Sequence, residues 1–115
     1  AAPLTDETRH MINAQVLARA RNCWLINVAR APLVDDAAML DALDDGRLAG
    51  AALDVFMSEP LPADSPLWLH PRVLISPHVA GVTSIEGAVD GFLQALRALE
   101  QGRKPERVVD MREGY

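Results

Sequence analysis

The chain has 115 residues, half of them hydrophobic, and a formal net charge of −5 at pH 7, which suits one soluble globular domain or a part of one. Its eleven Lys and Arg residues are scattered, which argues against a nucleic-acid partner, and no apolar run approaches the roughly 20 residues of a membrane helix. Cys23 is the single cysteine, so an internal disulfide is excluded, and the first residues lack a signal-peptide pattern. We therefore expect a cytoplasmic protein.

The amino-terminal stretch AAPLTDETRHMI begins without methionine and reads as a turn between a strand and a helix, so we expect the chain to be a fragment. The next segment, residues 13–21, has Val16, Leu17 and Ala20 at helical spacing. Asn13 is a suitable N-cap for this short helix.

The run CWLINVA, residues 23–29, is almost continuously apolar. This pattern predicts a parallel-sheet strand covered on both faces, with Cys23 buried as a small hydrophobe. Pro32 then breaks the chain, and Asp35 or Asp36 is expected to cap a helix over residues 37–45 that ends at Gly46.

A second apolar run, residues 50–56, ends beside Asp54 and leads to Glu59. Four prolines between residues 59 and 72 predict an irregular loop with one short turn around residues 66–69. The third strand, residues 73–76, delivers His78, and Gly81 is expected to supply the backbone freedom for the turn that follows.

Thr83 and Glu86 form a capping-box pattern before a long amphipathic helix that continues to Leu99 and ends before Gly102. The elements predict an α/β fold: a partial doubly wound, Rossmann-like parallel sheet of about three strands with flanking helices. Four further side chains have no motif support. We expect Trp24 and Trp68 to lie in the core, and His10 and His70 to lie on the surface.

Arg30, Asp54, Glu59 and His78 each lie just past the end of a predicted strand. In a parallel sheet these positions gather at one edge, where ligands bind. An arginine fork can hold a carboxylate, a histidine can exchange a proton with an oxygen, and a carboxylate can orient that histidine. Together they suit reduction of a 2-oxo acid by a hydride donor.

The motifs NVAR, LDVF-x-x-EP and SPHVAG, in this order, resemble those of the D-isomer-specific 2-hydroxyacid dehydrogenases. The resemblance covers about the first hundred residues, and the ending RVVDMREGY is similar to the glyoxylate and hydroxypyruvate reductase branch. It implies that residues 1–102 are the second half of a dinucleotide-binding domain. Residues 103–115 would be a tail that packs on a substrate domain outside this chain.

The resemblance implies roles residue by residue. Arg30 matches the arginine that binds the substrate carboxylate, His78 the acid/base, Glu59 its carboxylate partner, and Asp54 a residue near the nicotinamide ring and its carboxamide. The cofactor is NAD or NADP, and no metal is implied. The residues expected at the cofactor are Pro3, Thr5, Ala29, Arg30, Asp54, His78 and Gly81.

Two features depart from the family pattern. Ala31 stands where the family usually has glycine, for which we expect a small local adjustment. No G-x-G-x-x-G occurs, so the sequence does not distinguish NAD from NADP, and we expect the isolated chain to be inactive.

We therefore interpret the chain as part of an NAD(P)H-dependent reductase of small 2-oxo acids such as glyoxylate and hydroxypyruvate, acting as a homodimer. The alternative is an NAD(H)-binding sensor of the corepressor type, and a third reading is a small α/β domain without an active site. Turnover of NADH by the full-length parent with some 2-oxo acid would separate the enzyme from the sensor.

Overall fold

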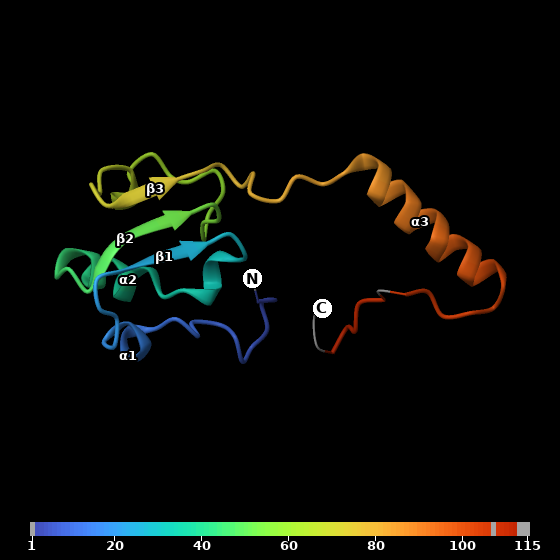
Figure 1. Cartoon of the computed structure of the whole chain (residues 1–115), viewed down its shortest axis with the longest axis horizontal. Helices are drawn as coiled ribbons and strands as arrows, with labels where there is room; N and C mark the ends of the chain where they lie inside the picture. Colours follow the sequence, from blue (N-terminus) through green and yellow to red (C-terminus); the bar gives the residue numbers. More distant parts are fainter. Residues whose placement is uncertain (1, 107, 113–115) are drawn as a thin grey trace. The chain divides into compact units, whose positions relative to one another are not determined.

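The computed structural model describes residues 2–106 and 108–112, in two compact units, Ala1–Ala80 and Gly81–Tyr115. The first unit contains a parallel sheet of three strands in the order β1-β2-β3 (Figure 1). The strands are β1 (Cys23–Asn27), β2 (Leu48–Leu53) and β3 (Val73–Ile75). The predicted three-stranded parallel sheet is thus confirmed, although each strand ends one to three residues earlier than the apolar runs suggested.

The register brings the carboxyl ends of the strands level with one another. Asn27 pairs with Leu53, and Leu53 pairs with Ile75. Two further hydrogen bonds continue the ladder past the strands, because Asp54 N–H donates to the Asn27 carbonyl (3.0 Å) and Ser76 N–H to the Leu53 carbonyl (2.9 Å). The residues that follow the three strands therefore start from one edge of the sheet.

The helices of this unit begin at the predicted caps. Helix α1 (Ala14–Leu17) is capped by Asn13, whose side chain accepts from two backbone N–H groups, and α2 (Asp36–Asp44) is capped by Asp35. Helix α1 ends earlier than predicted because the chain tightens into i→i+3 hydrogen bonds at Arg19 and then turns at Asn22, where φ is 53°. Two short 3₁₀ helices, η1 (Ala31–Leu33) and η2 (Pro66–Trp68), complete the unit, the second confirming the turn predicted among the prolines.

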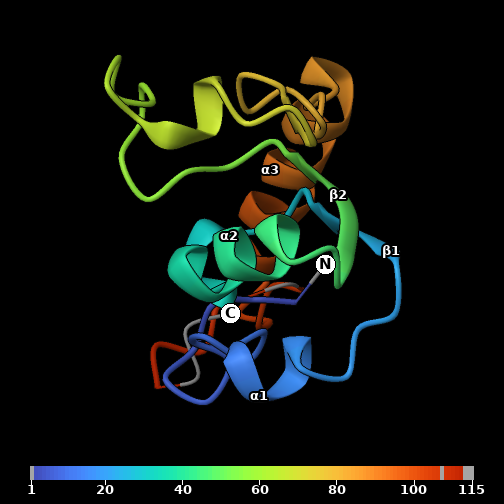
Figure 2. The ribbon, with the colours of Figure 1, turned by 90° about the vertical axis from the view of Figure 1, so that its left-hand side faces the viewer.

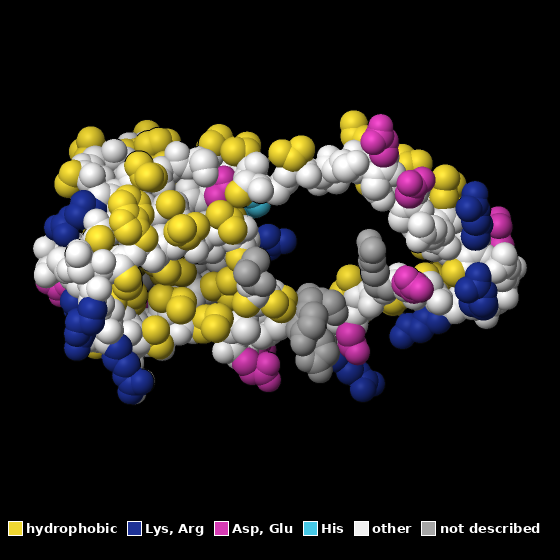
Figure 3. All heavy atoms as spheres, in the orientation of Figure 1, with side chains coloured by type: hydrophobic (Ala, Val, Ile, Leu, Met, Phe, Trp, Pro, Cys, Tyr) yellow, Lys and Arg dark blue, Asp and Glu magenta, His cyan; other side chains and the backbone are white. Residues whose placement is uncertain are grey.

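Within the first unit, the described residues cover one face of the sheet. Helix α2 packs its buried Met39 and Leu43 against the sheet, where Leu48 and Ala51 are also buried (Figure 2). On the opposite face the hydrophobic side chains are exposed, and Figure 3 shows such side chains gathered over the strands. These exposed residues of the sheet face are Trp24, Ile26, Val28 and Leu74.

The expectation that the first strand is covered on both faces is therefore wrong, and so are four residue placements, those of Trp24, Trp68, Cys23 and His70. Alternate residues of a strand point to opposite faces, which leaves Trp24 54% exposed. Trp68 is 51% exposed on η2, and Cys23 at the start of β1 is exposed rather than buried. The side chain of His70, expected at the surface, is only 10% exposed because it lies against Asp44, whereas His10 is exposed as predicted.

The second unit is built on α3 (Ile85–Glu100), which confirms the long amphipathic helix. Its N-cap is Ser84, whose hydroxyl accepts from Gly87 N–H (3.1 Å), so the cap lies one residue after the predicted Thr83. The helix ends before Gly102, which has a φ of 67° and donates to the Leu99 carbonyl. Among the described residues, no helix is long and apolar enough to cross a membrane. Of the predicted tail, residues 107 and 113–115 lie outside the described residues.

Candidate active site

His78 and Glu59 form the one side-chain pair among the predicted catalytic residues that is in direct contact. His78 Nδ1 lies 2.8 Å from Glu59 Oε2, and both side chains are partly open to solvent. The other carboxylate oxygen of Glu59, Oε1, accepts from the backbone N–H of Phe56 (2.9 Å). These two donors, the His78 ring first, lower the pKa of Glu59 below its ordinary value.

The geometry assigns the tautomer of His78. An ionised carboxylate only accepts hydrogen bonds, so Nδ1 carries the proton that Glu59 receives. Nε2 is then left to hold or release a proton. This arrangement is what an acid/base histidine needs, because one ring nitrogen is fixed while the other exchanges a proton with a ligand.

Asp54 folds the loop that carries His78. Asp54 is 2% exposed, and its carboxylate accepts three hydrogen bonds, from the Ser76 hydroxyl (2.6 Å), Val79 N–H (2.9 Å) and Ala80 N–H (2.9 Å). The Ser76 hydroxyl contributes most to lowering the pKa of Asp54, and the two backbone donors add to it. Asp54 therefore binds the loop both before and after His78.

His78 itself adopts a left-handed backbone conformation, with φ at 55°. This conformation costs a non-glycine residue about 1–2 kcal/mol, so neighbouring contacts must hold it, and the bonds to Asp54 do so. The expectation that Gly81 would provide the unusual backbone angle is wrong, because the positive φ falls on His78 and not on Gly81. The strain thus lies at the candidate acid/base.

Arg30 follows β1 and is exposed, at the end of the strand that pairs with β2. Its Nη1 donates to the Ala29 carbonyl (2.7 Å), which leaves other guanidinium N–H groups for a ligand. Asn27, which the sequence did not single out, stabilises the turn of residues 28–30. Its side chain accepts from Ala29 N–H and donates to the Arg30 carbonyl. The available signal was a lone amide inside an apolar strand.

Ala31 needs no adjustment, since it starts η1 with a φ outside the left-handed region. The remaining predicted cofactor residues lie away from these contacts. Thr5 bonds to Thr8, and the Thr8 hydroxyl donates to the Pro3 carbonyl, so this segment closes on itself. Gly81 begins the second unit, and a Cβ added to it would contact no atom within 4 Å beyond its chain neighbours.

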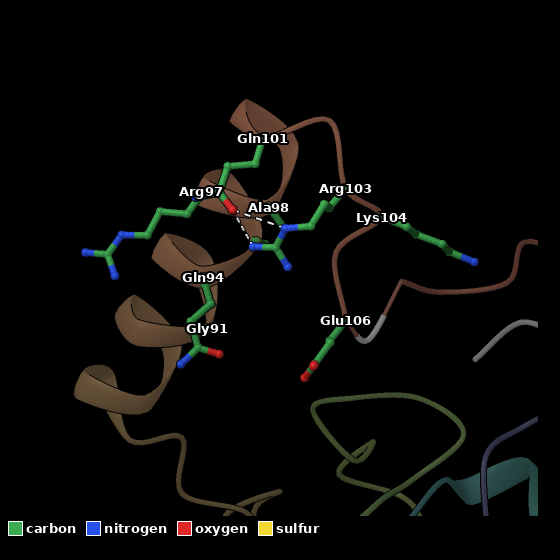
Figure 4. Close-up of a pocket in the computed structure, with 9 residues that line it drawn as sticks. Gly91, Gln94, Arg97, Ala98, Gln101, Arg103, Lys104 and Glu106 are labelled. Carbon is green, nitrogen blue, oxygen red and sulfur yellow. Dashed lines mark hydrogen bonds between the residues drawn. The ribbon is translucent and has the colours of Figure 1, made fainter.

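Two small pockets accompany the site. One, of about 180 Å³, lies beside Glu59 and His78 and has a mostly apolar lining that includes Phe56, Leu61 and Trp68. The other, of about 110 Å³, lies at the carboxyl ends of the strands beside Asp54. A separate pocket in the second unit contains Arg97, Arg103 and Lys104; Figure 4 shows Arg103 bound to Gln101 there, and none of the predicted site residues lines it.

Comparison with known proteins gives one family. The family described as D-isomer specific 2-hydroxyacid dehydrogenase, NAD binding domain, matches residues 1–80. Proteins named glyoxylate/hydroxypyruvate reductase A are 48% identical over 115 residues in Serratia proteamaculans and 43% identical over 114 residues in Salmonella paratyphi B. Each alignment covers 98% of this chain but 36% of the relative, so the chain spans about a third of the length of these relatives.

Solved structures agree in fold. A D-isomer specific 2-hydroxyacid dehydrogenase from Xanthobacter autotrophicus Py2, in complex with NADPH and MES, is 45% identical with a TM-score of 0.93, covering 99% of this chain and 48% of that one. An NADPH-dependent glyoxylate/hydroxypyruvate reductase from Sinorhizobium meliloti, in complex with NADP and sulfate, is 37% identical with a TM-score of 0.90, covering 99% and 38%. From its motifs, its sheet and these matches, the chain belongs to the D-isomer specific 2-hydroxyacid dehydrogenase family.

Proposed function

We propose that the full-length parent of this chain is an NAD(P)H-dependent reductase that converts small 2-oxo acids, glyoxylate and hydroxypyruvate, to 2-hydroxy acids. The observation that carries the proposal is the 2.8 Å contact between His78 Nδ1 and Glu59 Oε2 at the carboxyl edge of a parallel sheet. The names of the relatives favour this function over an NAD(H)-binding sensor.

The residues take complementary parts. The guanidinium of Arg30 would hold the substrate carboxylate and help to polarise the neighbouring carbonyl. His78 Nε2 would give a proton to the carbonyl oxygen as that oxygen gains charge, and in the reverse direction would take it back. Glu59 keeps the imidazole in the required tautomer through Nδ1.

The cofactor would supply the hydride. The place we propose for its nicotinamide end is supported by the 110 Å³ pocket beside Asp54, which is lined by small and apolar residues at the strand ends, among them Ala52 and Val28. Asp54 would lie at this end, as the resemblance implies, while its two carboxylate oxygens also hold the His78 loop. The other residues that we propose at the cofactor are Pro3, Thr5, Ala29, Arg30, His78 and Gly81.

The test is turnover by the full-length parent, followed as NADPH or NADH oxidation with glyoxylate and with hydroxypyruvate. His78→Asn should lower kcat by about 10²–10⁴-fold with little change in KM, because proton transfer contributes on this scale. Asparagine tolerates the left-handed backbone of His78, so the loop should remain folded.

His10→Asn is the matched control, since His10 is also exposed and has a φ of 51°. Its kcat should match that of the wild-type protein. A protein that binds NADPH but does not oxidise it, whichever 2-oxo acid is offered, would be a sensor and not a reductase.

We also propose that residues 1–102 are the second half of a dinucleotide-binding domain and that residues 103–115 pack on a substrate domain. The exposed apolar side chains of α3, among them Phe92 at 67%, support burial against further protein. We propose a homodimer in the cytoplasm, where the exposed thiol of Cys23 would stay reduced. Sedimentation of the full-length parent would test the dimer, and limited proteolysis the boundary near residue 102.

A further inference from the structure

Asn27 is an unusual residue in the core of the sheet. Among the residues that the structure describes, Asn27 (6% exposed) and Asp54 (2% exposed) are the buried polar or charged ones. Burying an amide without partners costs free energy, so both of its ends must be satisfied where it lies. Asn27 meets this condition within a single turn, at the end of β1.

The side-chain hydrogen bonds of Asn27 both go to the turn that presents Arg30. Its Oδ1 accepts from Ala29 N–H (3.1 Å) and its Nδ2 donates to the Arg30 carbonyl (3.0 Å). Ala29 in turn accepts from Arg30 Nη1 at its carbonyl (2.7 Å). A continuous set of contacts therefore runs from the buried amide to the guanidinium.

The same residue is tied to the neighbouring strand end. The carbonyl of Asn27 accepts from Asp54 N–H (3.0 Å), and Asp54 holds the His78 loop. Asn27 thus sits where the two site loops meet the sheet. Its place in the strand is fixed by the pairing with Leu53.

We propose that Asn27 is a positioning residue that fixes the turn of residues 28–30 and, through it, the guanidinium of Arg30 toward the substrate carboxylate. This inference rests on the proposed function. A bidentate contact depends on geometry, and misplacement of a binding group by about 1 Å can cost about 10²-fold in rate. Asn27 would act on the oxo acid through the guanidinium of Arg30.

The test is a double-mutant cycle in the full-length parent, with kcat and KM measured for glyoxylate and for NADPH. Asn27→Ala should raise KM for glyoxylate about tenfold or more. In an Arg30→Ala background the same substitution should add less than about twofold, because the group that it positions is gone.

Two further variants separate positioning from mere folding. Asn27→Asp keeps the acceptor for Ala29 N–H but places a carboxylate oxygen against the Arg30 carbonyl, so its KM for glyoxylate should also rise. Leu43→Ala removes a fully buried side chain of α2 and should lower Tm without changing either KM.

The outcomes are distinct. Additive effects of Asn27→Ala and Arg30→Ala, or an unchanged KM for glyoxylate in a folded Asn27→Ala protein, would overturn the inference while leaving the reductase function intact. A wild-type protein that turns over no 2-oxo acid would overturn the proposed function and this inference with it. If Asn27→Ala does not fold, Asn27→Asp in the Arg30→Ala background decides by the same criterion.

Discussion

Replacing Glu59 by glutamine tests the role of the His78–Glu59 pair most directly. Glutamine has the same shape, but it has one acceptor oxygen and a donor amide where glutamate has two acceptors. Phe56 N–H donates to one oxygen of Glu59 (2.9 Å) and His78 Nδ1 faces the other (2.8 Å). A glutamine that keeps the bond from Phe56 must turn its NH₂ group toward His78.

The consequence is a change of tautomer. The amide would donate to Nδ1, so the neutral imidazole would carry its proton on Nε2 and could not accept one there. Oxidation of the 2-hydroxy acid should therefore be lost, and reduction should fall as the protonated ring loses its carboxylate partner. We expect kcat in full-length Glu59→Gln to drop by about 10²–10⁴-fold, with KM for NADPH unchanged.

The assay is steady-state kinetics in both directions, with glyoxylate and NADPH and then with glycolate and NADP. Asp64→Asn is the matched control, because it neutralises an exposed carboxylate in the same proline-rich loop and should have no effect. A Glu59→Gln protein that is folded and keeps kcat within about threefold in the oxidative direction would refute the assignment of Glu59 to His78.

The remaining predictions concern three other positions. Arg30→Lys should lower kcat/KM for the oxo acid by about tenfold or more, since lysine lacks the planar fork; an unchanged value would contradict bidentate binding. The pKa of Asp54 lies below its ordinary value, so its ionised form contributes stability above the unfolded value of about 3.9 that is lost as pH falls through the folded value. The free energy of unfolding, measured with denaturant, should accordingly fall more steeply with decreasing pH below about pH 4 in the wild-type protein than in Asp54→Asn. Equal pH slopes in the two proteins would count against the contacts of Asp54 with Ser76 and the loop. Gly50→Ala would place a Cβ 2.6 Å from the far end of the Trp24 ring, which is half-exposed and can shift, so Tm should fall by an amount equivalent to no more than about 1 kcal/mol; a larger fall would show that the ring is held in place.

Much of this protein can be predicted from local sequence. The caps Asn13 and Asp35 and the period of α3 are local properties of short segments, and each was found within a residue or a few of its predicted place. The motifs also placed Glu59 and His78 at one edge of the sheet, after two different parallel strands, and the structure brings their side chains into contact. Local signals suffice for the caps and for α3 because these features depend on neighbours in the chain.

Other features depend on contacts between distant segments. Helix α2 covers one face of the sheet only, so Trp24 became exposed although its strand reads as buried. The left-handed φ of His78 depends on Asp54, which lies 24 residues earlier in the sequence and contacts the loop only once β2 and β3 have paired. The side-chain partners of Asn27 lie only two and three residues later, but Asn27 is buried, and its carbonyl accepts from Asp54 N–H, only once β1 has paired with β2. Composition and periodicity thus determined the elements and the residue types at the strand ends, whereas tertiary pairing decided which buried polar groups hold Arg30 and His78 in place.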